Sequence, residues 1–210
     1  MGVIKQGILG GFSGKVANVV GSSWKGIAVI KSRPLSVANP KTAAQTGQRT
    51  KFSAAVALAV TVLTTLVKPL WDRFAQLQSG YNAFIKANID AFSTAGVPTY
   101  ANIVISQGSL LGQVINAINA TNGSDSVEVT FTDNSGSGNA LTTDEVYVMV
   151  WNETQDNIGV ASGAETRGDA SASLNMPTNC VTGDVLHAYL AFRKADGTLV
   201  SPTDYDTDTV

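Results

Sequence analysis

The stretch DVLHAYLAFRK, residues 184–194, decides how the second half of this chain folds. Successive side chains of a β-strand point to opposite faces, so a strand that packs against a core alternates between two sets of residues. One set in this stretch is wholly apolar: Leu186, Ala188, Leu190 and Phe192. The other set comprises His187, Tyr189 and Arg193. The alternation predicts a long strand with its apolar face in a core.

Further strand-like segments precede this stretch. They are SVEVTFT (126–132), EVYVMVWN (145–152), ASASLNM (170–176) and GQVINAINA (112–120). Turn sequences such as DNSGSGN, PTNCVTGD and ADGT separate them. Five to seven short strands divided by turns are typical of a β-sandwich. The sequence therefore predicts an immunoglobulin-like sandwich, but without the cysteine pair of antibody domains, because Cys180 is the only cysteine.

The first third of the chain has a different pattern. Residues 3–31 alternate short apolar clusters with glycine, and the runs KVANVV and GIAVIK are rich in Val and Ile. We expect strands near residues 15–20 and 26–33 that form a hairpin, with the sequence GSSWKG between them as the turn.

Two helices are expected after this hairpin. Asn39-Pro40 favours a helix start, because Asn is a good N-cap and Pro is favoured at the first helical position. We expect this helix to continue to Val67 and to end or kink at Lys68-Pro69. Apolar residues at helical spacing predict a second helix over residues 70–93. These residues are Trp71, Phe74, Leu77, Tyr81, Phe84 and Ile85.

The segment STAGVPTYANIV (93–104) contains Gly and Pro and marks a change of pattern. The sequence therefore predicts an α+β protein. Residues 1–98 would form a basic domain of one β-hairpin plus two helices, and residues 99–210 an acidic immunoglobulin-like β-sandwich domain.

Charge is distributed unevenly along the chain. Residues 1–71 carry nine Lys and Arg and no Asp or Glu, whereas residues 102–210 carry three basic and fourteen acidic residues. Such a chain can bind a polyanion at its basic end, or it can join copies of itself basic end to acidic end. Alternatively, the charged residues of each half only keep that half in contact with water and bind no partner.

The sequence offers little for catalysis. With one His and one Cys, the chain cannot by itself form a catalytic triad or a histidine-rich metal site. We expect His187 to be a surface or edge residue of its strand. Asp144-Glu145 opens a strand, and the three aspartates of TDYDTDTV (203–210) lie in an expected terminal tail. Neither group supplies the buried pair of carboxylates that acid–base hydrolysis needs. We therefore expect no enzymatic activity, no cofactor and no metal.

The run FSAAVALAVTVLTTLV (52–67) is as apolar as a membrane span. Sixteen helical residues rise about 24 Å, which is short of the hydrocarbon core of about 30 Å. We expect a buried helix instead, packed within the chain or between subunits, and no membrane partner. The N-terminal sequence lacks the long apolar core and cleavage site of a signal peptide.

Phe12 and Trp24 are interleaved among the basic residues of the first 51 positions, and we expect this region to form contacts with other macromolecules. The predicted interaction residues are Lys15, Trp24, Lys25, Lys31, Arg33, Asn39, Pro40, Gln45, Arg49 and Lys51. Arg33, Arg49 and Lys51 would pair with acidic surfaces of neighbouring subunits. Trp24 would anchor an apolar contact, as buried aromatic residues do at interfaces. Nucleic acid is the alternative partner, through phosphate contacts and base stacking.

The first half of the chain resembles a family of uncharacterised proteins common in Bacteroidota genomes. Its motifs are a Gly-rich start, a Trp-Lys-Gly turn and the pattern Asn-Pro-x-Thr-x-x-Gln-x-x-x-Arg. The matching residues are Gly11, Gly14, Lys15, Val16, Trp24, Lys25, Gly26, Asn39, Pro40, Thr42, Gln45, Arg49 and Phe52. The segments DNSGSGNA, DEVYVMVWN and GDVLHAYLAF are similar to its β-rich C-terminal half. The family implies no catalytic residues.

Similar Asn-Pro-x-Thr-x-x-Gln segments occur in phage and prophage structural proteins, and this resemblance implies a virion role. We therefore expect a non-enzymatic structural protein of a bacteriophage-type virion, in a capsid, its decoration or the head–tail assembly, made in the bacterial cytoplasm. Its partners would be other copies of itself and other virion proteins, and no small-molecule substrate is expected. The alternatives are a nucleic-acid-binding protein packaged with DNA and a cell-surface module that binds protein or glycan.

Overall fold

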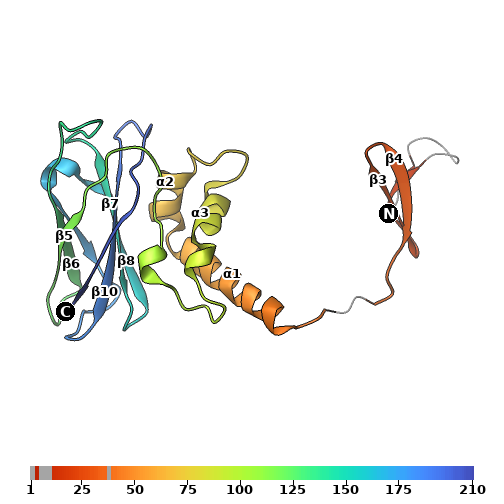
Figure 1. Cartoon of the computed structure of the whole chain (residues 1–210), viewed down its shortest axis with the longest axis horizontal. Helices are drawn as coiled ribbons and strands as arrows, with labels where there is room; N and C mark the ends of the chain where they lie inside the picture. The colour runs from red at the N-terminus through yellow and green to blue at the C-terminus, as the bar shows by residue number, and fades with distance from the viewer. Residues whose placement is uncertain (1–2, 5–10, 37–38) are drawn as a thin grey trace. The chain divides into compact units, whose positions relative to one another are not determined.

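The computed structural model describes residues 3–4, 11–36 and 39–210, which form two compact units, Met1–Thr42 and Ala43–Val210 (Figure 1). The first unit is called the N-terminal sheet and the second the body. This division differs from the boundary predicted after residue 98, because the helices pack against the β-sandwich and belong to the same unit as its strands.

The N-terminal sheet has four antiparallel strands in the order β1 (Val3–Ile4), β2 (Phe12–Val16), β3 (Val19–Trp24) and β4 (Ile27–Ser32). The strand predicted over residues 26–33 is confirmed as β4, but the one predicted over 15–20 is wrong, because the chain turns between β2 and β3. Most of GSSWKG is strand. Only Lys25 and Gly26 form the turn, both with positive φ, as a type I′ hairpin requires.

The body begins with α1 (Ala43–Thr61), so the helix start predicted at Asn39-Pro40 is wrong by three residues. The helix bends by 71° at Val62 and continues as a π-helical segment (Leu63–Val67) and α2 (Lys68–Trp71). The predicted break at Lys68-Pro69 thus lies one to two turns earlier. Within the helix, the Pro69 ring would clash with the carbonyl four residues before it. The widened π-helical bonds, such as Lys68 N–H to the Leu63 carbonyl, accommodate it.

The single helix predicted over residues 70–93 is interrupted. The chain leaves α2 at Trp71 and re-enters a helix as α3 (Gly80–Asn88), followed by a 3₁₀ turn (Ile89–Ala91). Ser79 caps α3 by accepting a hydrogen bond from the Asn82 amide at 3.3 Å, and the Asp72 carboxylate accepts one from the Gly80 amide at 3.1 Å. Gly80 therefore begins a helix and does not bend one.

Seven antiparallel strands form two sheets. The larger has the order β11 (Asp204–Thr209), β10 (Val185–Arg193), β7 (Glu145–Asn152) and β8 (Asn157–Thr166). The smaller has the order β5 (Ile115–Ala120), β6 (Ser126–Phe131) and β9 (Ser171–Asn175). The 203–210 segment expected to be a tail is therefore an edge strand, β11. A further 3₁₀ turn at Tyr100–Asn102 and another at Arg167–Asp169 complete the body.

The larger sheet is covered on both faces. Leu186, Leu190 and Phe192 of β10 lie in the core between the two sheets, as the alternation predicted. Tyr189 of β10 and Met149 of β7 lie on the opposite face and pack against the helices. Figure 1 shows the helices on one side of this sheet and β5 and β6 on the other. The result is a body of three layers, helices, sheet and sheet, and the α+β class is confirmed.

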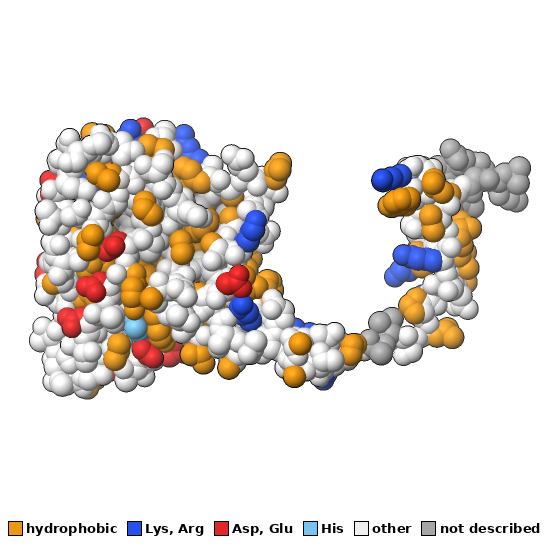
Figure 2. Space-filling model, in the orientation of Figure 1, with side chains coloured by type: hydrophobic (Ala, Val, Ile, Leu, Met, Phe, Trp, Pro, Cys, Tyr) orange, Lys and Arg blue, Asp and Glu red, His pale blue; other side chains and the backbone are white. Residues whose placement is uncertain are grey.

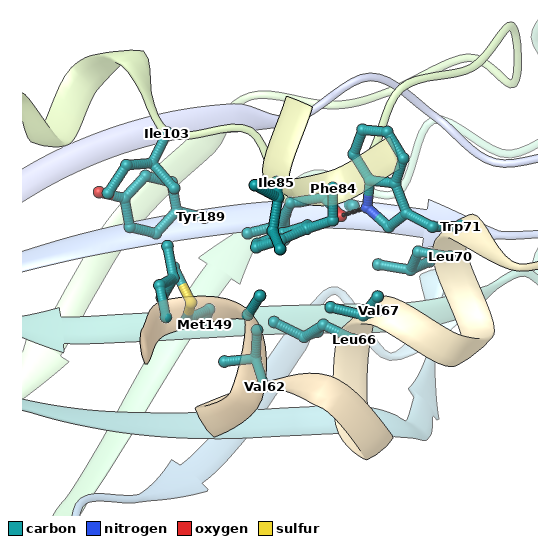
Figure 3. Packing of buried hydrophobic residues seen from close by; sticks show 14 of the residues in the cluster. Val62, Leu66, Val67, Leu70, Trp71, Phe84, Ile85, Ile103, Met149 and Tyr189 are labelled. Carbon is teal, nitrogen blue, oxygen red and sulfur yellow. Dashed lines mark hydrogen bonds between the residues drawn. The ribbon is translucent and has the colours of Figure 1, made fainter. Parts of the chain in front are cut away.

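Figure 3 shows how the helical layer meets the sheet. Leu66 and Phe84, both fully buried, point from the helices toward Met149 and Tyr189. The indole N–H of Trp71 donates to the Ile105 carbonyl at 2.7 Å, so the polar atom of this large side chain is satisfied inside the core. The apolar run 52–67 is thus mainly accounted for by packing within the chain, although Phe52 and Val60 stay exposed.

Among the described helices, none is long and apolar enough alone to cross a membrane. Taken together, α1 and the segment Leu63–Trp71 meet the limits of length and composition as a pair bent by 71°.

Replacing Phe84 by Ala should lower the free energy of unfolding of the body by about 3–5 kcal/mol, because a fully buried ring is lost between the helices and the sheet. Chemical denaturation followed by circular dichroism measures this change. The control, Val60→Ala on the exposed side of α1, should change stability by less than about 0.5 kcal/mol. Equal effects of the two variants would contradict a shared core.

Candidate interaction surfaces

The N-terminal sheet has almost no core of its own. Among its described residues 11–36, only Gly21 is buried. The ring of Phe12 lies so close to Gly21 that a Cβ added there would be 2.6 Å from a ring carbon, so no larger residue fits. Elsewhere the strands leave large apolar side chains in solvent, with Trp24 64%, Ile27 61% and Ile30 65% exposed. A sheet of this kind needs another surface to cover it.

Both faces of this sheet carry apolar residues. The strand register places Trp24 opposite Ile27 and places Lys15, Val20 and Lys31 side by side, so these five residues share one face. The other face carries residues that are nearly all apolar: Phe12, Val16, Val19, Ala28 and Ile30. Figure 2 shows hydrophobic and Lys or Arg side chains together on this unit.

The turn between β3 and β4 brings a cation and an aromatic ring together. Residues 24–27 are called the hairpin tip. The Lys25 ammonium lies 5.1 Å from the centre of the Trp24 ring, within the range of a cation–π contact. Both side chains are exposed. Arg33, just after β4, is exposed as well, and its amide donates to the Asn18 carbonyl at 2.7 Å.

The remaining predicted interaction residues lie later in the chain. Asn39 and Pro40 lie in an irregular segment before α1, and Gln45 and Arg49 lie on α1. Lys51 pairs with Asp90 of the same body at 2.7 Å. The Lys51 side chain is only 19% exposed, and its pairing with an acidic neighbouring subunit stays a prediction. Lys15, Trp24, Lys25 and Lys31 therefore belong to the N-terminal sheet, whereas Gln45, Arg49 and Lys51 belong to the body.

The body contains an open cavity of about 620 Å³ beside α1. We call it the α1 hollow. Its apolar wall consists of Ala54, Ala57 and Leu58 of α1 with Phe92, Val97, Pro98, Ile158 and Pro177. Its other lining residues include two aromatic rings and two carboxylates: Tyr100, Trp151, Glu153 and Asp156. The hollow therefore combines apolar surface with negative charge at one side.

Hydrogen bonds and ring contacts fix the aromatic side of the hollow. The Trp151 indole N–H donates to Asp156 Oδ1 at 3.3 Å, and the Tyr100 ring meets the Trp151 ring edge to face at 5.4 Å. Burial, and then the charges of Glu153 and Asp156, raise the pKa of Tyr100 to about 12. Two carboxylates thus act on the same ring.

His187 contacts Glu153, which lines the hollow. Its Nε2 lies 3.0 Å from Glu153 Oε2, its Nδ1 lies 2.9 Å from the Tyr205 hydroxyl, and its ring stacks on Tyr100 at 3.9 Å. The expectation of a surface or edge residue is wrong, because β10 lies inside the sheet and Tyr100 covers the ring. Both ring nitrogens already have partners, so the arrangement suits a positioning role and not proton transfer to a substrate.

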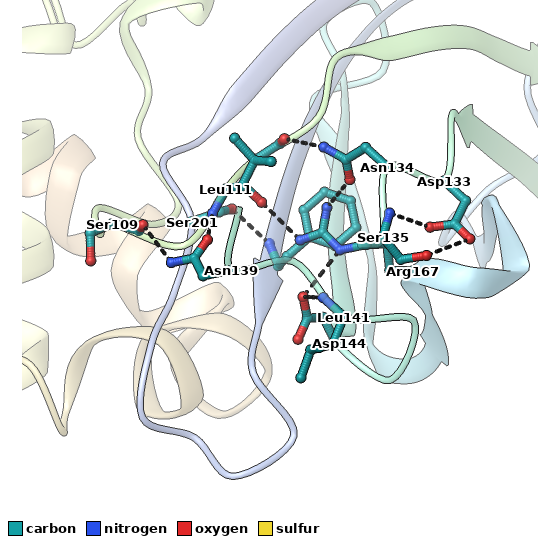
Figure 4. Close-up of polar contacts among 12 residues, drawn as sticks. Ser109, Leu111, Asp133, Asn134, Ser135, Asn139, Leu141, Asp144, Arg167 and Ser201 are labelled. Atoms are coloured by element: carbon teal, nitrogen blue, oxygen red, sulfur yellow. Dashed lines mark hydrogen bonds and ion pairs between the residues drawn. The ribbon is translucent and has the colours of Figure 1, made fainter. Parts of the chain in front are cut away.

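A second polar network connects the loops at one end of the sandwich (Figure 4). The fully buried Arg167 donates to Asp144 Oδ2 at 3.1 Å, to Asn134 Oδ1 and to the Leu111 carbonyl at 2.8 Å. Its guanidinium also lies over the Phe192 ring at 3.9 Å. Burial lowers the pKa of Arg167 and the nearby Asp144 opposes this shift. Because all three loops converge on one side chain, this network serves structure.

The described residues contain no group of three or more His, Cys, Asp or Glu placed to hold a metal ion. Cys180 is fully buried between β9 and β10, and burial raises the pKa of its thiol.

Sequence reasoning missed the α1 hollow altogether. Its lining comes from α1, residues 92–100, the β7–β8 turn and Pro177, which are far apart in the chain. The one local signal was the sequence WNETQD, residues 151–156, which puts a Trp beside two carboxylates at the end of a predicted strand.

A family model described as "Family of unknown function (DUF6266)" matches residues 11–206. No curated protein matches the chain.

Replacing Tyr100 by Phe should reduce the loss of stability in alkali. A phenol whose pKa is raised when folded contributes stability that is complete below its unfolded pKa of about 10 and is lost as pH rises toward 12. The free energy of unfolding of the wild type should therefore fall between pH 10 and pH 12, and the Phe variant should fall less steeply. Identical slopes in denaturant titrations across this range would contradict the assignment.

Proposed function

Because the chain belongs to DUF6266, a family of unknown function, we propose from its own surfaces that it is a non-enzymatic assembly protein that docks through its N-terminal sheet. The observation that carries this proposal is the sheet with exposed Trp24, Ile27 and Ile30 and one buried residue among those described. A unit this small does not bury enough apolar surface to be stable alone, and association with a partner supplies the missing burial.

Charge supports a protein partner. Residues 1–42 carry six Lys and Arg and no Asp or Glu, whereas residues 43–210 carry eight basic and sixteen acidic residues. A basic unit that also presents large apolar side chains suits an acidic, partly apolar protein surface. Opposite charges speed such an encounter and fix its orientation.

We further propose that the assembly is a bacteriophage-type virion and that the protein is a component of its capsid, decoration or head–tail structure. The support for this step is the likeness of Asn39–Gln45 to segments of phage and prophage structural proteins. We also propose an immunoglobulin-like sandwich. Two antiparallel sheets support it, because the first, second and fifth strands of the sandwich form one sheet and the third, sixth and seventh lie together in the other, as in immunoglobulin domains.

Nucleic acid is the second candidate partner. The observation that favours it is the shared face of Lys15, Lys31 and Trp24, since cations and an aromatic ring can hold phosphates and stack a base. A gel shift over a salt series distinguishes the two proposals. Binding to DNA that falls steeply with salt supports this second function, and no shift at low salt removes it.

Replacing Ile27 by Asp should weaken association at least about tenfold, because Ile27 shares the face of Trp24 and a charge would be buried where that face docks. Light scattering over a concentration series measures the effect. The matched control is Val114→Asp, which puts the same charge on a body residue of similar exposure, 63%. It should associate like the wild type, and both variants should keep the melting temperature of the body. A wild type that remains monomeric at high concentration and low salt would contradict the proposal.

A further inference from the structure

We propose that the α1 hollow is the receptor for the hairpin tip of a second copy of this chain. This inference rests on the proposed function, because it names the partner surface that the N-terminal sheet docks on. The hollow would take an indole ring with a neighbouring ammonium group, which Trp24 and Lys25 present together.

The first argument is the match of apolar surface. Trp24 and Ile27 stand more than 60% exposed at the hairpin tip. The hollow has a volume of about 620 Å³, within the range of protein pockets that bind organic groups, and one wall is formed by small and apolar residues of α1. Ala54 and Ala57 leave room there for a large ring. Burying an aromatic anchor in such a pocket is typical of the residues that dominate interface energies.

The second argument is the position of the charges. Asp156 is exposed at the side of the hollow, and Glu153, about half exposed, is held there by His187. A Trp24 ring placed against the α1 wall brings the adjacent Lys25 ammonium within reach of these carboxylates. The cation and ring are neighbours on the tip, and the carboxylates and apolar wall are neighbours in the hollow. The two surfaces are therefore complementary in both respects.

The contact is heterologous, because the tip and the hollow are different surfaces. Each copy would use its tip on one neighbour and offer its hollow to another, so the wild type should form rings or open filaments and not only pairs. Because each copy carries one tip and one hollow, blocking either surface changes the size of the assembly in a predictable way.

The test uses one variant of each surface in the full-length chain. Trp24→Ala removes the anchor, and Ala57→Trp fills the hollow from an exposed position on α1. Each variant alone should associate at least about 30-fold more weakly than the wild type. Mixed together, they should form 1:1 pairs and stop there, because each pair contains one intact tip and one intact hollow. Analytical ultracentrifugation distinguishes these species.

Matched controls separate the hollow from general effects. Val60→Trp adds the same ring to an exposed position of α1 that does not line the hollow, and it should associate like the wild type. Lys25→Glu should weaken association about fivefold, and the double variant Lys25→Glu/Asp156→Lys should regain most of it. Lys25→Glu/Asp125→Lys makes the same charge change at another exposed aspartate and should not.

The outcomes separate this inference from the proposed function. If Trp24→Ala dissociates the assembly but Ala57→Trp does not, docking through the N-terminal sheet stands and the hollow is not its receptor. If both variants dissociate it but the mixture does not form pairs, the assignment of tip to hollow is overturned. A monomeric wild type, or association that neither variant changes, overturns both.

Discussion

The body depends on one constraint, which is that β7 and β10 must be covered on both faces. Val148 and Leu190 face the second sheet, while Met149 and Tyr189 face the other way, and all four are buried. Each buried apolar side chain contributes about 1.5–3 kcal/mol to stability relative to the same side chain in water. Without the helices, Met149 and Tyr189 would be exposed and this contribution would be lost. The bend at Val62 and the break before Gly80 keep the helical layer against the sheet.

The N-terminal sheet shows the opposite condition. Its strands form a regular antiparallel ladder, and a type I′ turn joins β3 to β4. Most of its large apolar residues are nevertheless exposed in the described part of the chain. Strand β4 is also an edge of this sheet, and no described strand pairs with its outer side. One chain thus joins a unit with a complete core to a unit that buries little apolar surface among its described residues. This contrast supports the assembly role proposed above.

Sequence patterns predicted the strands that carry strong alternation. Residues 184–194 and 145–152 were predicted as strands and are β10 and β7, and the apolar face predicted for β10 lies in the core between the two sheets. Strands β8 and β11 were missed, since NIGVASGAET is rich in small residues and DYDTDT is polar at every second position. The helix break at residues 72–79 depends on tertiary packing and on caps from Ser79 and Asp72, which a helical period does not reveal.

The hairpin tip was predicted as an interaction site and the hollow was not, for a simple reason. The tip is local in sequence, whereas the hollow exists only after four distant segments have packed. His187 illustrates the same limit. Its neighbours in the chain suggested exposure, but Tyr100, 87 residues away in sequence, covers its ring.

The buried Cys180 has a practical consequence. Because the chain has a single thiol and the fold shields it completely, a thiol-specific reagent can modify the protein only when the region around β9 and β10 opens. The modification rate in native buffer would therefore report the frequency of this local opening from a residue already present. The same measurement on assembled and dissociated protein would reveal whether association lowers the frequency of local opening around Cys180.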